Sequence, residues 1–308
     1  MENILILGGA GYTGSALAYL LVRGGYNVTV IDNFLFDEGV FNALIKYENF
    51  NVIKHDVRDL REDTFKKYDT IFPLAAIVGA PACEKYKFDA TSINRDSLKY
   101  LCTSISSQQK IIYPTTNSGY GATSGAIECN EETPLNPISL YGKLKKEAEG
   151  IVMDRENSIS FRLATVFGVS PRPRIDLLVN DFVYKAFMDK CLVLFEQNFK
   201  RNYIHVDDVS EAYLFSIQNF EKLKSNVFNL GLSDANLTKK ELALKIKKFL
   251  PDTEIISSEI GKDPDKRNYI VSNKKIENSG FKASRSLDQG INELLKYYSY
   301  LSKKNSNV

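Results

Sequence analysis

A glycine-rich turn directly after a short apolar segment constrains the fold of this chain more than any other feature. Residues 3–7 are Asn-Ile-Leu-Ile-Leu, typical of a buried parallel strand, and residues 8–14 are Gly-Gly-Ala-Gly-Tyr-Thr-Gly. A helix is predicted over about 14–23, ended by the glycine pair 24–25. Glycine permits a tight turn and lets a pyrophosphate approach the positive end of that helix. The stretch therefore predicts a dinucleotide site.

Strands and helices alternate along the first half of the chain, which predicts an α/β fold with a Rossmann-type, doubly wound parallel sheet. The further predicted strands are 27–31, 51–53, 70–72, 110–113 and 158–161, and the later predicted helices are 94–107 and 139–155. Beyond Gly168 the alternation is less regular. We expect a dinucleotide-binding subdomain over 1–165 and a smaller C-terminal substrate-binding subdomain mainly over 166–308, with 200–218 returning to the first.

Composition excludes several classes of protein. A net charge of +2 gives no strong field for nucleic acid or a membrane surface. The four cysteines are scattered without a Cys-x-x-Cys pair or a nearby histidine, so we expect no disulfide, no metal site and a reducing cytoplasm. The first strand starts at about the third residue and no apolar run approaches about 18 residues, so we expect neither a signal peptide nor a membrane span.

The residue that ends the second predicted strand indicates which dinucleotide binds. Asp32 can accept hydrogen bonds from a free ribose diol, but its carboxylate would repel a 2′-phosphate. The next residues are Asn33 and Phe34, and no arginine directly follows. The sequence therefore predicts NAD rather than NADP.

The order of several motifs resembles the extended short-chain dehydrogenase/reductase family, and within it the nucleotide-sugar epimerases and dehydratases. These motifs are the turn 8–14, Asp32, Asp56-Val57, 74–76, Asn94, Thr116, Tyr141 with Lys145, 201–209, 226–231 and 265–269, so the resemblance covers nearly the whole chain. It implies a set of cofactor-binding residues: Gly8, Gly11, Tyr12, Thr13, Gly14, Asp32, Asn33, Asp56, Val57, Leu74, Ala75, Ala76, Asn94, Tyr141 and Lys145.

The predicted catalytic residues have a physical rationale of their own. Tyr141 and Lys145 are four residues apart, hence on one face of one helix. A phenol with a pKa of about 10 is a poor base at neutral pH, and a nearby ammonium favours its phenolate. Thr116 would orient a substrate hydroxyl; Thr115 is the competing candidate, and the family register favours Thr116.

The two residues after Thr116 narrow the chemistry. Members of the family that eliminate water have Asp-Glu there, whereas this chain has Asn117 and Ser118, and members that epimerise C3 or C5 add a cysteine with a histidine or lysine that we do not find. We therefore expect oxidation at C4 of the sugar, as a 4-epimerase or a net 4-dehydrogenase. The alternatives are a 4,6-dehydratase-like or 4-keto-reductase activity, or a non-catalytic NAD-binding regulator.

The expected partner is a nucleotide-diphosphate sugar, GDP- or UDP-linked, since arginines bind phosphates with two-pronged geometry. The resemblance implies these substrate-binding residues: Asn117, Ser118, Arg174, Asn180, Arg201 and Arg267. Residues 162–168 and 171–174 are similar to a subgroup that includes GDP-heptose 4-oxidising enzymes of capsule synthesis. By analogy we expect a homodimer or homotetramer formed through helices 94–107 and 139–155. His205 is expected to be a packed core histidine.

Overall fold

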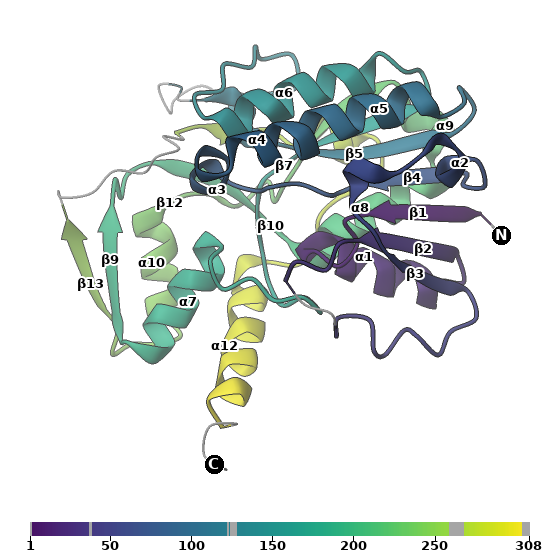
Figure 1. Ribbon diagram of the computed structural model, residues 1–308. Coiled ribbons are helices and arrows are strands. Elements are labelled where there is room, and N and C mark those ends of the chain that lie inside the picture. The colour runs from purple at the N-terminus through teal and green to yellow at the C-terminus, as the bar shows by residue number, and fades with distance from the viewer. Residues whose placement is uncertain (1, 37–38, 122, 124–127, 259–267, 304–308) are drawn as a thin grey trace.

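The computed structural model describes residues 2–36, 39–121, 123, 128–258 and 268–303. A large parallel sheet with helices on both faces forms one side of the molecule, and a smaller unit lies beyond the carboxyl ends of its strands (Figure 1). The predicted Rossmann-type α/β fold is confirmed.

The large sheet has seven strands, and every neighbouring pair is parallel. In spatial order they are β3 (Phe50–Lys54), β2 (Asn27–Asp32), β1 (Asn3–Leu7), β4 (Thr70–Pro73), β5 (Lys110–Thr116), β7 (Ser158–Leu163) and β11 (Asn226–Leu230). Because the strands are parallel, their carboxyl ends meet at one edge of the sheet, and this edge is where ligands bind in such folds.

Helices cover both faces of this sheet, so its strands are apolar on both sides. In β1, Ile4 and Ile6 pack in one core cluster and Leu5 and Leu7 in another. The first cluster is covered by α1 (Tyr12–Arg23), α8 (Val206–Gln218), α9 (Phe220–Leu223) and α11 (Lys274–Asn278). The second is covered by α2 (Glu62–Phe65), α5 (Ser97–Ser104) and α6 (Leu140–Met153). Shorter helical segments are α3 (Ala80–Lys85), α4 (Lys87–Thr91), a π-helical turn (Ser92–Asp96), and 3₁₀ turns at Val57–Asp59 and Asn117–Tyr120.

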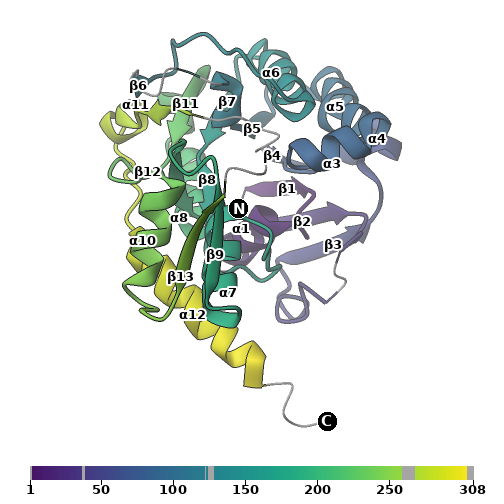
Figure 2. The same ribbon diagram turned by 90° about the vertical axis from the view of Figure 1, so that its left-hand side faces the viewer.

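The smaller unit has its own apolar core, which packs α7 (Leu178–Met188), α10 (Lys239–Lys247) and α12 (Leu287–Lys303) together (Figure 2). Its strands form three small sheets: β8 (Thr165–Phe167), β10 (Lys200–His205) and β12 (Asn236–Thr238); β9 (Cys191–Phe195) with β13 (Glu254–Ser258); and β6 (Glu128–Cys129) with β14 (Ile270–Val271). The chain returns to the large unit in α8, which packs on α1. The exact division at residue 165 stays a prediction.

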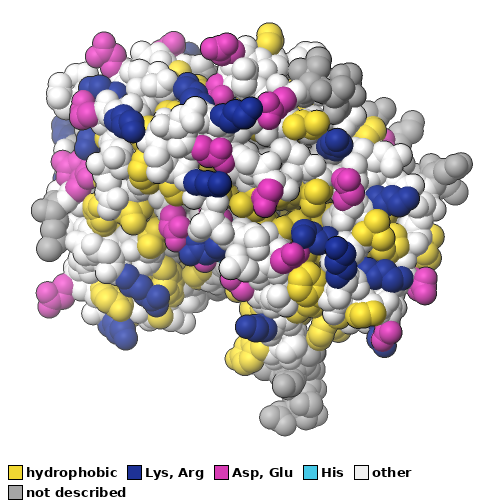
Figure 3. Space-filling model, turned by 180° about the vertical axis from the view of Figure 1, so that it is seen from behind, with side chains coloured by type: hydrophobic (Ala, Val, Ile, Leu, Met, Phe, Trp, Pro, Cys, Tyr) yellow, Lys and Arg dark blue, Asp and Glu magenta, His cyan; other side chains and the backbone are white. Residues whose placement is uncertain are grey.

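Three properties of the described residues are the charge on one face, the length and apolarity of the helices, and the grouping of possible metal ligands. On the face seen in Figure 3, Lys and Arg side chains are interspersed with Asp and Glu, without a broad region of one sign. Across the part of the chain that the structure describes, no helix is both long and apolar enough to cross a membrane. Within those residues, no group of three or more His, Cys, Asp or Glu side chains is placed to hold a metal ion.

A buried ion pair joins α6 to the sheet beneath the carboxyl edge. Arg162 of β7 lies 2.7 Å from Glu149 of α6, measured from Nη2 to Oε1, and both side chains are less than a tenth exposed. The same carboxylate accepts a hydrogen bond from Thr115 Oγ1 on β5 at 2.9 Å, and Arg162 Nη1 donates to the Tyr120 hydroxyl at 3.0 Å. Four segments are therefore held together at one point.

Removing one partner of this pair is expected to destabilise the fold strongly. Glu149→Ala leaves Arg162 buried without its counter-charge, and such a loss costs about 3–5 kcal/mol. The matched control is Glu147→Ala on the same helix, whose exposed contact with Arg95 spans 3.3 Å and is worth about 0–1 kcal/mol. The free energy of unfolding, measured in urea, checks both. Equal losses in the two variants would contradict the structural role of the buried pair.

Candidate active site

The predicted site residues lie mostly along the carboxyl edge of the large sheet. The glycine turn follows β1, Asp32 ends β2, residues 74–76 follow β4, and Thr116 ends β5. Helix α6 carries Tyr141 and Lys145 to the same edge. Segments separated by more than a hundred residues are thus brought together, as the sequence predicts.

The glycine turn has the geometry of a phosphate-binding cradle. Gly8 adopts φ +78°, and a Cβ built on it would lie 2.4 Å from the backbone nitrogen of Ala75. A Cβ on Gly14 would lie 2.7 Å from the Gly8 carbonyl oxygen. Only glycine fits at these two positions, and Gly14 lies in the first turn of α1 together with Tyr12 and Thr13. The backbone therefore fits a dinucleotide pyrophosphate at the helix N-terminus.

Asp32 is held in a fixed orientation by the backbone. Its Oδ2 accepts a hydrogen bond from Ala10 N at 2.9 Å, and its Oδ1 accepts one from Phe34 N at 2.8 Å. Burial raises the pKa of Asp32, while these backbone donors oppose the rise. Each carboxylate oxygen has a second acceptor site, so the side chain can still accept a ribose hydroxyl, the role we propose for it.

The residues proposed for the adenine and the pocket wall also come together. A small pocket is lined by Val57, Ala75 and Asn94, which come from three distant segments. Asn94 lies in the π-helical turn and exchanges two hydrogen bonds with the backbone of Ile77, at 2.8 and 2.9 Å. π-Helical turns are frequent at functional sites, and this one explains why regular α5 starts only at Ser97, later than predicted.

Asp56 lies in a charged network beside that pocket. It accepts hydrogen bonds from the backbone and side chain of Arg58, and these hydrogen bonds lower the pKa of Asp56 to about 2. Arg58 also contacts Asp89 of α4 at 2.7 Å. Leu74 continues β4 by donating its backbone N–H to the Leu7 carbonyl at 2.8 Å, which fixes the segment 74–76 next to the glycine turn.

One face of α6 is bonded to strand β5 through side chains four residues apart. Tyr141, Lys145 and Glu149 occupy positions i, i+4 and i+8, and all three are buried. Lys145 Nζ donates to the Tyr113 hydroxyl and to the Pro114 carbonyl oxygen, both at 3.0 Å. Burial lowers the pKa of Lys145 to about 8. Burial, and next the neighbouring Tyr141, raise the pKa of Tyr113.

The structure separates the two candidate threonines. Thr115 is buried and donates to Glu149, so its hydroxyl serves the ion pair. Thr116 is only half-buried, and its Oγ1 lies 2.9 Å from Ser118 Oγ and accepts the Ser118 backbone N–H at 3.1 Å. This difference supports our proposal that Thr116, rather than Thr115, contacts the substrate.

Asn117 is the most unusual polar residue at this edge. It is 1% exposed, yet neither its Nδ2 nor its Oδ1 has a hydrogen-bond partner among the described residues. Leaving such an amide unpaired costs about 1–3 kcal/mol per group. An amide that can both donate and accept, held next to Thr116 and buried Ser118, is suited to a polar substituent of a bound substrate.

The three predicted substrate-binding arginines have different surroundings. Arg174 Nε donates to Asp176 at 2.7 Å. Burial lowers the pKa of Arg174, but the hydrogen bond to Asp176 and the nearby Tyr141 and Tyr12 raise it, and the net change is upward. Arg201 is buried in β10. Arg267 lies outside the described residues.

Asn180 is hydrogen-bonded to the backbone of the loop that follows β8, and its predicted contact with phosphate stays a prediction. Its Oδ1 accepts from Gly168 N at 3.0 Å, and its Nδ2 donates to the carbonyl oxygens of Gly168 and Arg174 at 3.3 and 2.8 Å. The Tyr12 hydroxyl donates to the same Gly168 carbonyl at 2.7 Å. We therefore propose that Asn180 positions the loop after β8.

The sequence analysis did not predict the contact between Tyr113 and Lys145. The alternation of side chains along a strand could have predicted it, since Tyr113 and Thr115 lie on one face of β5 and both bond α6.

His205 is fully buried, as predicted, with Nε2 3.0 Å from Glu293 Oε2.

Three features together define a dinucleotide-dependent oxidoreductase. They are the glycine cradle, the acidic residue at the end of β2, and a helix that carries a tyrosine and a lysine four residues apart. Residues 4–231 match the NAD dependent epimerase/dehydratase family, and the chain belongs to that family. The predicted group of nucleotide-sugar epimerases and dehydratases is confirmed, with NAD as cofactor.

Individual relatives include both epimerases and dehydratases. The chain is 28% identical to a UDP-arabinose 4-epimerase of Arabidopsis thaliana, over 86% of this chain and 74% of that protein. It is also 28% identical to a dTDP-D-glucose 4,6-dehydratase of Dictyostelium discoideum, over 80% of this chain but only 62% of that protein's length. The fold is similar to UDP-glucuronic acid 4-epimerase from Bacillus cereus in complex with UDP-glucuronic acid and NAD, with a TM-score of 0.85 and 21% identity over 97% of this chain and 100% of that one.

The lowered pKa of Lys145 predicts a distinctive pH dependence of stability. Its ordinary value is 10.5 and its folded value about 8, so between these pH values the unfolded chain binds more protons than the folded one. The contribution of Lys145 to the free energy of unfolding must therefore rise with pH across that window. Lys145→Met is expected to lack this rise, as measured by urea unfolding at intervals from pH 7.5 to 10.

The control for this titration is Lys143→Met, which removes an exposed lysine from the same helix. Its pH profile is expected to run parallel to that of the wild type. Parallel profiles for wild type and Lys145→Met would show that Lys145 keeps an ordinary pKa in the folded protein.

Proposed function

We propose that this protein oxidises C4 of a nucleotide-diphosphate sugar to a 4-keto sugar and completes the reaction as a 4-epimerase. The observation that carries this proposal is the absence of an acid after Thr116. Elimination needs a positioned acid and base. Asn117 and Ser118, which are both buried, have side chains that do not ionise near neutral pH, so neither can act as that acid or base.

Three side chains would act on the sugar. Tyr141 would remove the C4 hydroxyl proton, and Thr116 would orient that hydroxyl through Oγ1. Lys145 would favour the phenolate of Tyr141, and its hydrogen bonds to Tyr113 and Pro114 hold the ammonium in place. When bound, NAD supplies the hydride acceptor at this edge of the sheet. Asn117 would bind a polar substituent of the sugar with its unpaired amide.

The specific substrate belongs to this proposal as well. Arg174 and Arg201 are the described arginines that we propose for the diphosphate, and either a UDP- or a GDP-linked sugar meets that requirement. Relatives named as UDP-arabinose and UDP-glucuronic acid 4-epimerases support the UDP form. The GDP-heptose resemblance, a capsule-related role and a dimer or tetramer stay predictions.

A panel of UDP- and GDP-sugars deuterated at C4 tests the reaction directly. The proposal expects an epimer at C4 that keeps the deuterium, identified by NMR. Stoichiometric absorbance of reduced nicotinamide together with a released ketone would identify a net 4-dehydrogenase. A 6-deoxy product would identify a dehydratase, and no reaction with any member, although NAD binds, would favour the regulator.

Tyr141→Phe is expected to lower turnover by about 10²–10⁴-fold, the range for loss of a general base. NAD content of the purified protein is expected to stay unchanged, since the ring remains in place. Tyr100→Phe, which alters an exposed tyrosine of α5, serves as the control and keeps full activity. A fully active Tyr141→Phe variant would refute the assignment.

A further inference from the structure

The turn after β2 presents an aromatic side chain to solvent beside the proposed cofactor site. Phe34 has φ +55°, a conformation that bulky residues rarely adopt and that costs about 1–3 kcal/mol. Asp32 Oδ1 holds it by accepting Phe34 N, and Asn33 Oδ1 accepts Leu35 N at 3.1 Å. The chain then projects Phe36, which is 70% exposed. Strain and exposure at the ribose end of the site suggest a function.

A loop of the smaller unit, residues 168–174, crosses to the first turn of α1; we call it the strap. Ser170 Oγ donates to the Tyr12 carbonyl oxygen at 2.7 Å, and the Arg172 backbone N–H donates to Ser15 Oγ at 3.3 Å. These bonds attach the strap to the helix whose N-terminus faces the proposed pyrophosphate cradle. The position of the strap is therefore tied to the cofactor site.

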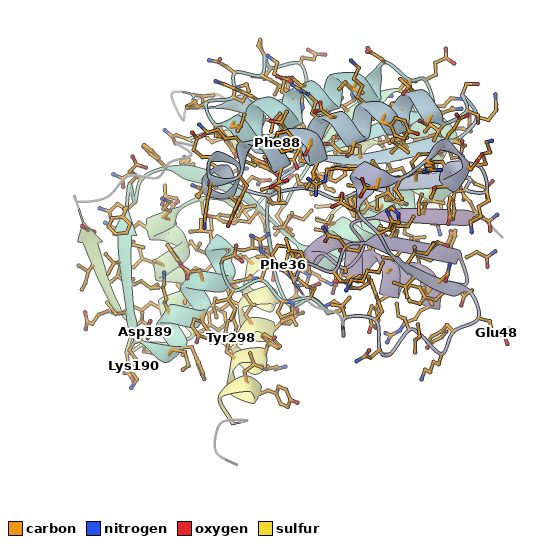
Figure 4. All side chains as sticks on the ribbon, in the orientation of Figure 1. Phe36, Glu48, Phe88, Asp189, Lys190 and Tyr298 are labelled. Carbon is orange, nitrogen blue, oxygen red and sulfur yellow. The ribbon has the colours of Figure 1, made fainter. Side chains whose placement is uncertain are left out.

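The strap and the turn meet through Arg172 and Phe36. The guanidinium carbon of Arg172 lies 4.3 Å from the centre of the Phe36 ring. Figure 4 shows Phe36 between the start of α1 and helix α7, where the two units face each other. Burial raises the pKa of Asp32, and Arg172 is among the groups that oppose this rise. A cation from one unit thus lies over a ring from the other, within electrostatic reach of Asp32.

We propose that Arg172 and Phe36 form a clasp that closes over the bound dinucleotide and retains it between turnovers. Stacking uses the face of the guanidinium plane, and the pair joins the strap to the turn after β2. The strap is bonded to the first turn of α1, where the proposed pyrophosphate cradle lies. Release of the cofactor then requires the stacked pair to separate.

The inference concerns the retention of NAD, so it does not depend on which sugar is oxidised. It also has a consequence for the proposed function. A retained cofactor returns its hydride to the same sugar, as an epimerase requires, whereas a net dehydrogenase must exchange the cofactor in each cycle.

The test measures release of bound NADH, displaced by excess NAD and followed by NADH fluorescence, with no sugar present. Arg172→Ala and Phe36→Ala are each expected to speed release about tenfold, equivalent to about 1.4 kcal/mol. The double variant is expected to release NADH no faster than either single variant, because the pair acts as a unit. Arg172→Lys, which keeps the charge without the planar group, is expected to fall between wild type and Arg172→Ala.

A matched control exists at the other end of α1. Arg23 lies 5.5 Å from the ring of Tyr19, so Arg23→Ala breaks a similar pair away from the site and is expected to leave release unchanged. If Arg172→Ala lowers the thermal stability of the protein, Arg172→Gln takes its place in the test, because glutamine fills more of the space that arginine leaves.

Two results would overturn the clasp. One is a folded Arg172 variant whose NADH release stays within about twofold of the wild-type rate. The other is a raised KM for the nucleotide sugar with unchanged NADH release, which would assign Arg172 to the substrate. The first result does not depend on whether the C4 oxidation itself is confirmed, because the fluorescence assay runs without sugar.

Discussion

The buried contact between Arg162 and Glu149 is the constraint on which the site geometry depends. Two charges removed from water require partners with good geometry, and here the carboxylate also accepts from Thr115 while the guanidinium donates to Tyr120. The contact fixes α6 against β5 and β7. Since α6 carries Tyr141 and β5 carries Thr116, the ion pair sets the relation between the two groups proposed to act on the substrate.

Lys145 depends on the same arrangement. It lies between Tyr141 and Glu149 on one face of α6, and its ammonium is held by a carbonyl and a phenol of β5. Burial makes its charged form less favourable and lowers its pKa to about 8. Perturbed pKa values of this kind cluster at functional sites, which supports the proposed role of Lys145.

A second set of contacts joins the two units of the molecule across the cofactor edge. Tyr12 of α1 donates to the Gly168 carbonyl, and Asn180 of α7 bonds the backbone of the same glycine. The smaller unit is thus attached to the helix that begins at the glycine cradle. The proposed cofactor and sugar sites therefore share one loop, residues 168–174, which also carries Arg172 of the proposed clasp.

The sequence by itself determined the parallel sheet, the glycine cradle, Asp32 at a strand end and the Tyr141–Lys145 pair. Each of these follows from local spacing, backbone freedom or helical periodicity. The tertiary structure alone decided that Thr115 donates to the ion pair, that Asn180 bonds the backbone of residues 168 and 174, and that Tyr113 accepts a hydrogen bond from Lys145. It also brought Arg172 over Phe36. These pairings join residues far apart in the chain, so no local pattern encodes them, and only the packing of the two units brings their side chains within bonding distance.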